Sequence, residues 1–454
     1  MMHGRDQSDP LVLAMRLTNN AERSAAESTE RRSGAKGKTP KPTMRRAPNR
    51  ESMSLGLERL RQFVRNTPKA RPTALLHHLN VDLLRWSYYA LKRRAAVGVD
   101  GQTWEAYGEN LEENLRDLHD RVHRGAYRAL PSRRRTIPKP DGKMRPLGIA
   151  SIEDKIVQRA VVEILNRIYE QEFLGFSYGF RPGRNQHDAL DALWVGISTT
   201  AVNWIVDADI RSFFDAVNHE WLIRFMEHRI GDKRILRLIR KWLKAGVLEG
   251  TMLTTSESGT PQGAVASPLL ANIYLHYCYD LWVQQWRKRN ARGNMIVVRY
   301  ADDLVAGFEH ESEAKAFLNE LRTRFKAFDL EVHPEKTRLI EFGRHAALRR
   351  KKRGLGKPET FTFLGFVHIC GKSRNGRFLI WRKSRRDRMR ARLQSIKSDL
   401  HRKMHETLNA QGRWLRTVVV GYFNYHAVPT NSASLAAFRW HVFRLWYRAL
   451  RRRS

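Results

Sequence analysis

Residues 297–304 read Val-Val-Arg-Tyr-Ala-Asp-Asp-Leu, and this stretch decides how the rest of the chain is interpreted. The adjacent carboxylates Asp302 and Asp303 follow a run of β-forming residues, and apolar residues resume directly after them. This pattern predicts a hairpin in which two strands flank an acidic turn. Like charges at a tight turn repel each other unless a cation lies between them, and carboxylate oxygens suit Mg²⁺. A solvated acidic turn is the simpler alternative, so a metal site needs a third carboxylate from elsewhere.

A second acidic block, residues 204–215, reads Trp-Ile-Val-Asp-Ala-Asp-Ile-Arg-Ser-Phe-Phe-Asp. Its apolar, β-branched start predicts a buried strand, and Asp209 falls at the end of that strand. A carboxylate in this place does little for stability but is well placed to bind a metal ion. Asp207 and Asp215 have a simpler explanation as capping or loop residues. Asp209 is therefore the candidate for the third carboxylate.

Carboxylates from two separate strands suggest a site that holds two Mg²⁺ ions. In phosphoryl transfer of this type, one ion activates a 3′-hydroxyl and the other binds the triphosphate of an incoming nucleotide. We expect Asp209 and Asp302 to bind the ions, with the backbone carbonyl of Ile210 as a further ligand. Asp303 is expected either to bind metal directly or to shape the charge of the site.

The two acidic blocks resemble the palm of a reverse transcriptase, and the wider chain resembles the group II intron-encoded reverse transcriptase/maturase family. Eight blocks occur in the order typical of that family: Ala-Val-Gly-Val-Asp-Gly (96–101), Ile-Pro-Lys-Pro-Asp-Gly-Lys-Met-Arg-Pro-Leu-Gly-Ile (137–149), Phe-Ser-Tyr-Gly-Phe-Arg-Pro-Gly (176–183), Asp-Ile-Arg-Ser-Phe-Phe-Asp (209–215), Gly-Thr-Pro-Gln-Gly (259–263) with Ser-Pro-Leu-Leu (267–270), Tyr-Ala-Asp-Asp (300–303), Glu-Val-His-Pro-Glu-Lys-Thr (331–337) and Phe-Leu-Gly-Phe (363–366). One block alone would be weak, but eight in order are specific.

The resemblance implies an α/β (α+β) fold with the right-hand architecture of polymerases, in which fingers, palm and a helical thumb follow one another. Residues 1–54 are rich in Arg, Lys, Ser, Pro and Gly and predict a disordered basic leader. We expect fingers at 55–200 and a palm at 201–368. Residues 369–454 are expected to form the thumb and the maturase-specific domain X, which is shorter here than in family members generally.

A basic hairpin is predicted at residues 137–149, where prolines and glycines punctuate two short strands. Such a rigid cationic flap suits a triphosphate. The resemblance assigns triphosphate contacts to Lys139 and Arg145, and adds Arg133 just before the hairpin. A solvated basic hairpin that touches template phosphates is the alternative.

Two further residues are expected to contact the incoming nucleotide. The resemblance places Gln262 near the nascent base pair, beside a glycine that permits close backbone approach. It assigns to Phe214 the side chain that crowds the 2′-position of the sugar, so that the product is DNA. Phe213 is the rival for this role, in which case the other phenylalanine is core.

Three residues upstream and downstream of the acidic blocks are expected to bind nucleic acid. Arg181 and Arg184 follow an aromatic cluster, a mixture that suits template backbone and bases. The alternative is a set of core aromatics beside a surface arginine. Lys336 is expected near the primer end or the acidic site, and a surface lysine on a turn is an equally good interpretation.

The chain is strongly basic, with 83 Lys+Arg, 46 Asp+Glu and a formal net charge of +37 over 454 residues. This charge predicts a polyanionic partner and salt-sensitive binding. No apolar run approaches a membrane span, and no secretory signal is evident at the start. Two cysteines are too few for a disulfide framework or a thiolate zinc site. We therefore expect a prokaryotic cytoplasmic, nucleoid-associated protein that is not secreted and binds no membrane.

The C-terminal region interleaves arginines with aromatic residues. A helix near 384–404 carries arginines all round, including Arg385 and Arg388, and would repel itself unless phosphate lies against it. A later helix holds five aromatics among Arg439, Arg444 and Arg448, a composition that suits structured RNA. An apolar helix face with solvated arginines is the alternative. No Cys/His cluster of the family's HNH endonuclease is present in the sequence.

Together these features predict an RNA-directed DNA polymerase that also acts as a maturase for its intron RNA. The expected partners are the intron RNA, an RNA template with a DNA primer, and deoxynucleoside triphosphates. The alternatives are a splicing-only RNA-binding maturase and a retron or defence-type reverse transcriptase. The sequence leaves open which intron RNA and DNA site are bound, whether maturase activity survives the short C-terminus, and whether the protein is a monomer or a dimer.

Overall fold

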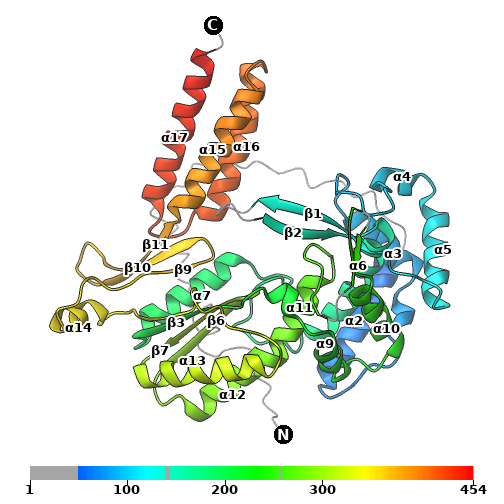
Figure 1. The fold of residues 1–454 in the computed structure, drawn as a ribbon, viewed down its shortest axis with the longest axis horizontal. Coiled ribbons are helices and arrows are strands. Elements are labelled where there is room, and N and C mark those ends of the chain that lie inside the picture. The colour runs from blue at the N-terminus through cyan, green and yellow to red at the C-terminus, as the bar shows by residue number, and fades with distance from the viewer. Residues whose placement is uncertain (1–49, 139–143, 251, 256–257, 453–454) are drawn as a thin grey trace.

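The computed structural model describes residues 50–138, 144–250, 252–255 and 258–452. Helices and small sheets form three regions, at the right, the bottom and the top of Figure 1. Helices and strands alternate through most of the chain, and the sheets have three or four strands each. The predicted α/β fold is confirmed.

The predicted palm is built on a four-stranded antiparallel sheet of order β6-β7-β3-β8. Its strands are β3 (Trp204–Asp209), β6 (Met295–Tyr300), β7 (Asp303–Phe308) and β8 (Arg338–Glu341). One face packs on α12 (Leu281–Asn290) and α13 (Glu311–Lys326), and the other packs on α7 (Gln186–Thr199) (Figure 1). Because both faces are covered, β6 and β7 are buried at almost every position rather than at alternate ones.

The predicted fingers combine a helical group with a second sheet of order β2-β1-β4-β5. Its helices are α2 (Arg50–Asn66), η1 (Leu76–His78), α3 (Val81–Ala90), α4 (Trp104–Glu109), α5 (Leu111–His123), α6 (Ile152–Tyr169), α9 (His219–Glu227) and α10 (Lys233–Lys244), and its strands are β1 (Ser132–Pro138), β2 (Met144–Ile149), β4 (Val247–Glu249) and β5 (Met252–Thr254). The hairpin predicted at 137–149 is present as β1 and β2, but β1 begins earlier, at Ser132, so Arg133 lies within it. The short α8 (Phe213–Ala216) and α11 (Ser267–Leu275) connect this region to the palm.

The predicted thumb is a bundle of three helices that stands away from the palm sheet (Figure 1). The β1–β2 hairpin of the fingers extends toward this bundle. The bundle consists of α15 (Arg386–Arg402), α16 (Leu408–His426) and α17 (Ser432–Arg451). The chain reaches it through α14 (Ala346–Lys352) and a three-stranded sheet of β9 (Phe361–Phe363), β10 (Phe366–Lys372) and β11 (Phe378–Ser384). The bundle has its own core, in which Ile396, Leu415 and Phe438 are buried. Across the described residues, no helix combines the length and apolarity that a membrane crossing requires.

Several predicted domain boundaries are wrong because the regions are not contiguous in sequence. Helix α2 begins at Arg50, inside the predicted leader 1–54, whose first 49 residues lie outside the described part. Strand β4 pairs with β1 and so joins the fingers sheet, although it lies in the segment 201–368. Helix α7 covers the palm sheet from within 55–200. The boundary after residue 368 cuts through β10, and the thumb helices start only at Arg386.

Candidate active site

The three predicted carboxylates lie together at one end of the palm sheet. Asp209 is directly opposite Asp303 in the antiparallel register of β3 and β7. Side chains opposed in this way share a face, with Cβ atoms about 4.5–5.5 Å apart. Asp302 sits in the tight turn between β6 and β7, next to Ala301, whose φ is +55°. Two distant segments thus bring three negative groups to one edge, as the sequence predicted.

The environment of this edge raises the pKa of Asp303. Loss of water around the carboxyl is the largest cause of a rise in its pKa to about 7, the charges of Asp302, Asp209 and Asp207 add to the rise, and Arg388 of the thumb opposes it. Like charges directly opposite each other on paired strands are destabilising. A bound cation would relieve this repulsion.

Asp207 is neither a cap nor a loop residue, contrary to the alternative considered from sequence. It lies within β3 and pairs with Arg338 of β8 at 3.5 Å. Burial raises the pKa of Asp207 to about 6, and the Asp209 charge adds to the rise while Arg338 opposes it. Asp207 therefore belongs to the strand that carries Asp209 and contributes to the acidic field.

Two features hold Asp209 in place. His333 N–H donates to the Asp209 carbonyl at 2.8 Å, and Arg211 N–H donates to the Glu331 carbonyl at 2.8 Å, so the 331–337 block pairs with the end of β3 around Ile210. Lys336 Nζ lies 2.7 Å from Asp209 Oδ2. The structure thus places Lys336 at the acidic site, and Ile210, which is buried, next to it.

The residues fit a divalent cation that takes oxygen ligands. Among the described residues, no three His, Cys, Asp or Glu side chains converge tightly enough to form a complete protein cage. Mg²⁺ in nucleotide-handling sites does not need one, because it is usually bound by one or two carboxylates together with waters and substrate phosphates. The opposed Asp209 and Asp303, with Asp302 beside them, supply that kind of partial site.

The two adjacent phenylalanines differ in burial. Phe213 is 2% exposed and belongs to the main core, whereas Phe214 is only partly buried. Thr260 N–H donates to the Phe214 carbonyl at 2.7 Å, which ties this residue to the Pro261-Gln262-Gly263 loop. Of the two rings, only Phe214 retains the exposure needed to contact a sugar.

The same loop reaches the fingers hairpin. Gly148 N–H of β2 donates to the Gln262 carbonyl at 2.7 Å. Gly263 has φ +108°, and a Cβ there would lie 3.0 Å from the Gly148 carbonyl oxygen, so glycine is required. A cavity of about 300 Å³ opens at this junction, and its lining includes Arg134, Gly148, Asp215 and Gln262.

Two of the three residues predicted to contact the triphosphate, Arg133 and Arg145, lie within the described part of the hairpin. Arg133 is half-buried on β1. Arg145 occupies the position opposite Ile137 in the β1–β2 register. Lys139 lies outside the described residues. The hairpin therefore has the predicted frame, with its tip left undescribed.

The assignment of Arg181 to nucleic acid is wrong. The side chain is buried, pairs with Glu170 at 2.9 Å, and donates to the carbonyls of Leu174 and Ser177. A guanidinium that is occupied in this way cannot also reach a template phosphate. Arg184 is half-buried; it donates to the backbone carbonyls of Gly175 and Ser177 and lies over the Tyr178 ring. The alternative of core aromatics with structural arginines describes this segment better.

The arginines predicted to bind nucleic acid in the C-terminal region lie at the start of α15 and on α17. Arg388 is exposed near the start of α15, close enough to Asp303 to affect its pKa, and Arg385 pairs with Asp387 at the same helix end. On α17, Arg439, Arg444 and Arg448 are all exposed.

The aromatic residues of α17 divide into two groups. Phe438 is buried and Trp446 packs against the bundle core, whereas Trp440, Phe443 and Tyr447 are 52%, 62% and 55% exposed. Arg444 lies over the Trp440 ring at 4.6 Å. The outward face therefore combines cations with exposed rings.

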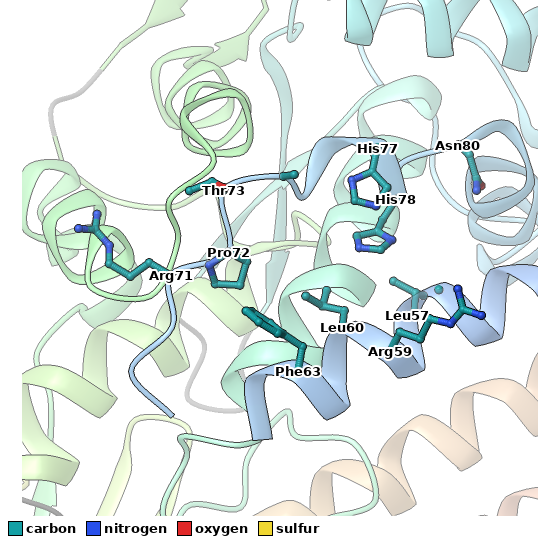
Figure 2. Close-up of a pocket in the computed structure, with 12 residues that line it drawn as sticks. Leu57, Arg59, Leu60, Phe63, Arg71, Pro72, Thr73, His77, His78 and Asn80 are labelled. Atoms are coloured by element: carbon teal, nitrogen blue, oxygen red, sulfur yellow. The ribbon is translucent and has the colours of Figure 1, made fainter. Parts of the chain in front are cut away.

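A second cavity of about 620 Å³ shares no lining residue with the acidic edge. It lies between α2 and residues 71–80, where Phe63 and Leu60 point toward Pro72 and His78 (Figure 2). Burial lowers the pKa of His78 to about 4, so its ring is neutral at physiological pH. The acidic edge of the palm remains the site with reactive chemistry.

Comparisons with known proteins agree with this geometry. The family model described as "Reverse transcriptase (RNA-dependent DNA polymerase)" matches residues 137–368, half of the chain. "Protein YkfC" of Escherichia coli (strain K12) is 37% identical over 236 residues, which cover 46% of this chain and 62% of that protein. "Group II intron-encoded protein LtrA" of Lactococcus lactis subsp. cremoris is 40% identical over 189 residues, which cover 41% of this chain and 31% of that protein. "Putative COX1/OXI3 intron 1 protein" of Saccharomyces cerevisiae is 26% identical over 401 residues, which cover 77% of this chain and 47% of that protein.

The right-hand fold and the paired acidic strands define a polymerase palm, and with the matched family model they show that the chain belongs to the reverse transcriptase family. Within that family, its similarity to the group II intron-encoded protein and to the yeast intron protein supports the predicted kinship with group II intron reverse transcriptases and maturases. The chain spans less than two thirds of the length of each of these relatives.

Proposed function

We propose that the chain is an RNA-directed DNA polymerase that extends a DNA primer on an RNA template with deoxynucleoside triphosphates. The observation that carries the proposal is the register pair Asp209 and Asp303, with Asp302 in the adjoining turn. Opposed carboxylates at the open end of a buried strand are costly without a cation and useful with one. When bound, two Mg²⁺ ions would activate the primer 3′-hydroxyl and neutralise the developing charge on the phosphates.

The protein's own groups then have distinct roles. Asp209 and Asp302, with the Ile210 carbonyl, would hold the ions, and Asp303 would support them as a further ligand or through its charge. The fingers hairpin, through Arg133, Lys139 and Arg145, would bind and orient the triphosphate.

Selection of the substrate would fall to the loop that joins fingers and palm. Gln262 would lie beside the nascent base pair, since its backbone is fixed to β2 at Gly148. Phe214 would crowd the 2′-position and favour deoxyribonucleotides. Lys336, Arg385 and Arg388 would contact the phosphates of the primer–template near the acidic edge.

A second activity, binding of the intron RNA to assist its splicing, is favoured by the outward face of α17. Exposed Trp440, Phe443 and Tyr447 alternate there with Arg439, Arg444 and Arg448. Exposed rings can stack on unpaired bases while arginines contact phosphates. A chain with this face and an intact acidic edge fits a polymerase that is also a maturase better than a splicing-only maturase. With a net charge of +37, we expect the protein to associate with nucleic acid in the nucleoid of a prokaryotic cell.

The test of the polymerase is direct. The purified chain should extend a DNA oligonucleotide annealed to an RNA template with deoxynucleotides and Mg²⁺, and chelation should stop the reaction. No extension with Mg²⁺ or Mn²⁺ on any annealed template would reject the proposal. Intron secondary structure in the DNA on both sides of the gene would support the maturase role over a retron or defence role.

A further inference from the structure

Directly beneath the acidic turn lies a buried ion pair that the sequence motifs did not single out. Arg299 and Asp280 are both 0% exposed. Arg299 Nε and Nη2 donate to the two carboxylate oxygens of Asp280 at 2.7 and 2.6 Å. Burying such a pair costs several kcal/mol per ion, and well-packed apolar residues are often as stable or more so. Stability alone therefore does not explain why this pair is here.

The remaining donors of Arg299 connect it to the turn. Nη1 donates to the Ala301 carbonyl at 3.1 Å and to Asn272 Oδ1 at 2.9 Å, and Nη2 donates to Ser177 Oγ at 2.6 Å. Ala301 is the residue between Tyr300 and Asp302. Its φ of +55° is left-handed, a conformation that costs an alanine roughly 1–2 kcal/mol. Arg299 thus bonds the residue that has the least favourable backbone in the turn.

The turn is also held from its other side. A Cβ on Gly179 would lie 2.2 Å from the Ala301 amide nitrogen, so the backbone of Gly179 packs against the turn with no space for a side chain. Asn272 Nδ2 donates to the Gly179 carbonyl at 2.7 Å while its Oδ1 accepts from Arg299. The turn is therefore clamped between one arginine and one glycine, and Asn272 joins them.

The element that carries Asp280 is itself unusual. Residues His276–Asp280 form a π-helical turn, η2, between α11 and α12. Such turns are rare and occur frequently at functional sites. Asp280 is the last residue of this π-helical turn, and Asn272 lies on α11 just before the turn. Both side chains contact the guanidinium of Arg299.

We propose that Arg299, held by Asp280, is a positioning residue that fixes the Ala301 turn so that Asp302 and Asp303 present their oxygens to the divalent ions in a preset geometry. The proposal rests on the proposed polymerase function and deepens it. Arg299 touches neither substrate nor metal; it acts through the backbone of Ala301. Groups that orient metal ligands from behind contribute about 10- to 100-fold to metal affinity or activity.

The deciding variant is Arg299→Met/Asp280→Leu. Replacing both partners with apolar residues leaves no orphaned charge, but it removes the hydrogen bond to Ala301. The matched control is Arg229→Met/Glu172→Leu, which removes a buried arginine and its partly buried partner in the fingers, a pair with a 2.8 Å contact and no bond to the turn. Both are compared with wild type in a complex with a chain-terminated primer, RNA template and the next deoxynucleotide.

Mn²⁺ binding to that complex is measured by electron paramagnetic resonance, which needs no turnover, alongside thermal unfolding and template–primer affinity. We expect the Arg299/Asp280 variant to unfold near the wild-type temperature and to bind template–primer normally, yet to bind Mn²⁺ about 10- to 100-fold more weakly. The control should bind Mn²⁺ as wild type does. A stable Arg299/Asp280 variant with wild-type Mn²⁺ affinity would overturn the proposal.

If the double variant does not fold, Arg299→Lys decides. A single ammonium keeps the charge opposite Asp280 but cannot make the forked contacts to Asp280 and Ala301 together. Weaker Mn²⁺ binding in a folded Arg299→Lys protein supports the proposal, and unchanged binding refutes it. Wild-type protein that neither binds Mn²⁺ in the ternary complex nor extends a primer would refute the polymerase itself, a result distinct from failure of the positioning role.

Discussion

Lys336 Nζ lies 2.7 Å from Oδ2 of Asp209, so an ammonium group contacts the carboxylate that we assign to metal. The lysine side chain is 63% exposed and the aspartate 25% exposed. A pair this accessible to solvent is worth about 0–1 kcal/mol. Lys336 can therefore leave Asp209 at little cost when a cation or a nucleic-acid phosphate competes for one of the two groups.

Replacing Lys336 with methionine should strengthen the binding of divalent metal to the protein without nucleic acid, by no more than about fivefold, because a weak competing cation is removed. Binding of the primer–template should weaken modestly, since one phosphate contact is lost. Mn²⁺ titration and template–primer titration measure the two effects. Weaker metal binding in Lys336→Met would mean that the lysine supports the site rather than competes for it.

The pKa of Asp303 predicts how metal binding depends on pH. Its value of about 7 lies above the ordinary 3.8, so the folded protein holds a proton there at pH 6 that must leave when the carboxylate takes a cation. Mn²⁺ affinity should therefore rise from pH 6 to pH 8 and level off above that range. In Asp303→Asn this rise should flatten. Equal pH dependence in the two proteins would show that another group binds the proton.

Phe214→Ala should raise the incorporation of ribonucleotides relative to deoxyribonucleotides, because removing the ring opens space for a 2′-hydroxyl. Phe213→Ala provides the contrast: it should lower stability, by about 3–5 kcal/mol, since that ring is in the core. Single-nucleotide insertion with matched ribo- and deoxyribonucleotides measures the ratio. A changed ratio in Phe213→Ala alone would reverse the assignment.

Neutralising Arg439, Arg444 and Arg448 together with glutamine should weaken binding to intron RNA transcribed from the DNA that flanks the gene. The slope of log affinity against log salt should fall by about 0.7–0.9 for each lost phosphate contact. Extension of a short, saturating template–primer should change much less, because the palm and fingers are untouched.

The matched control for this experiment neutralises three exposed cations behind the palm, Lys288, Arg289 and Lys326 on α12 and α13. These substitutions lower the net charge equally but should leave the RNA affinity closer to the wild-type value. If the α17 variant loses short-template extension as much as RNA binding, that helix serves the thumb's grip on the duplex, and the intron-binding role should be abandoned.

The palm was predictable from sequence because its signals are local. The strand that ends at Asp209 and the hairpin around Asp302 both show as β-forming runs beside carboxylates, and the structure has them within a residue or two. The domain boundaries were not predictable, because β4 and α7 cross between regions to complete a sheet and cover a core. The composition of β4 or α7 does not indicate which region of the fold it will pack against.

The wrong assignment of Arg181 and the lack of any prediction for Arg299 have a similar cause. Arg181 and Arg299 look alike in sequence, as single arginines beside aromatic residues. Burial separates them from surface arginines, and burial depends on Glu170 and Asp280, which lie 11 and 19 residues away. A motif shows which residues occur together, but not which of them turn inward.

The central claim is that Asp209 and Asp302 hold the ions that drive primer extension. Primer extension by Asp302→Ala on an RNA template with Mg²⁺ tests it most directly, with template–primer affinity measured in the same preparation. We predict that extension is abolished while affinity stays within a few-fold of wild type, because the substitution removes metal ligands and leaves the basic surface intact. Substantial extension by folded Asp302→Ala protein would contradict the assignment.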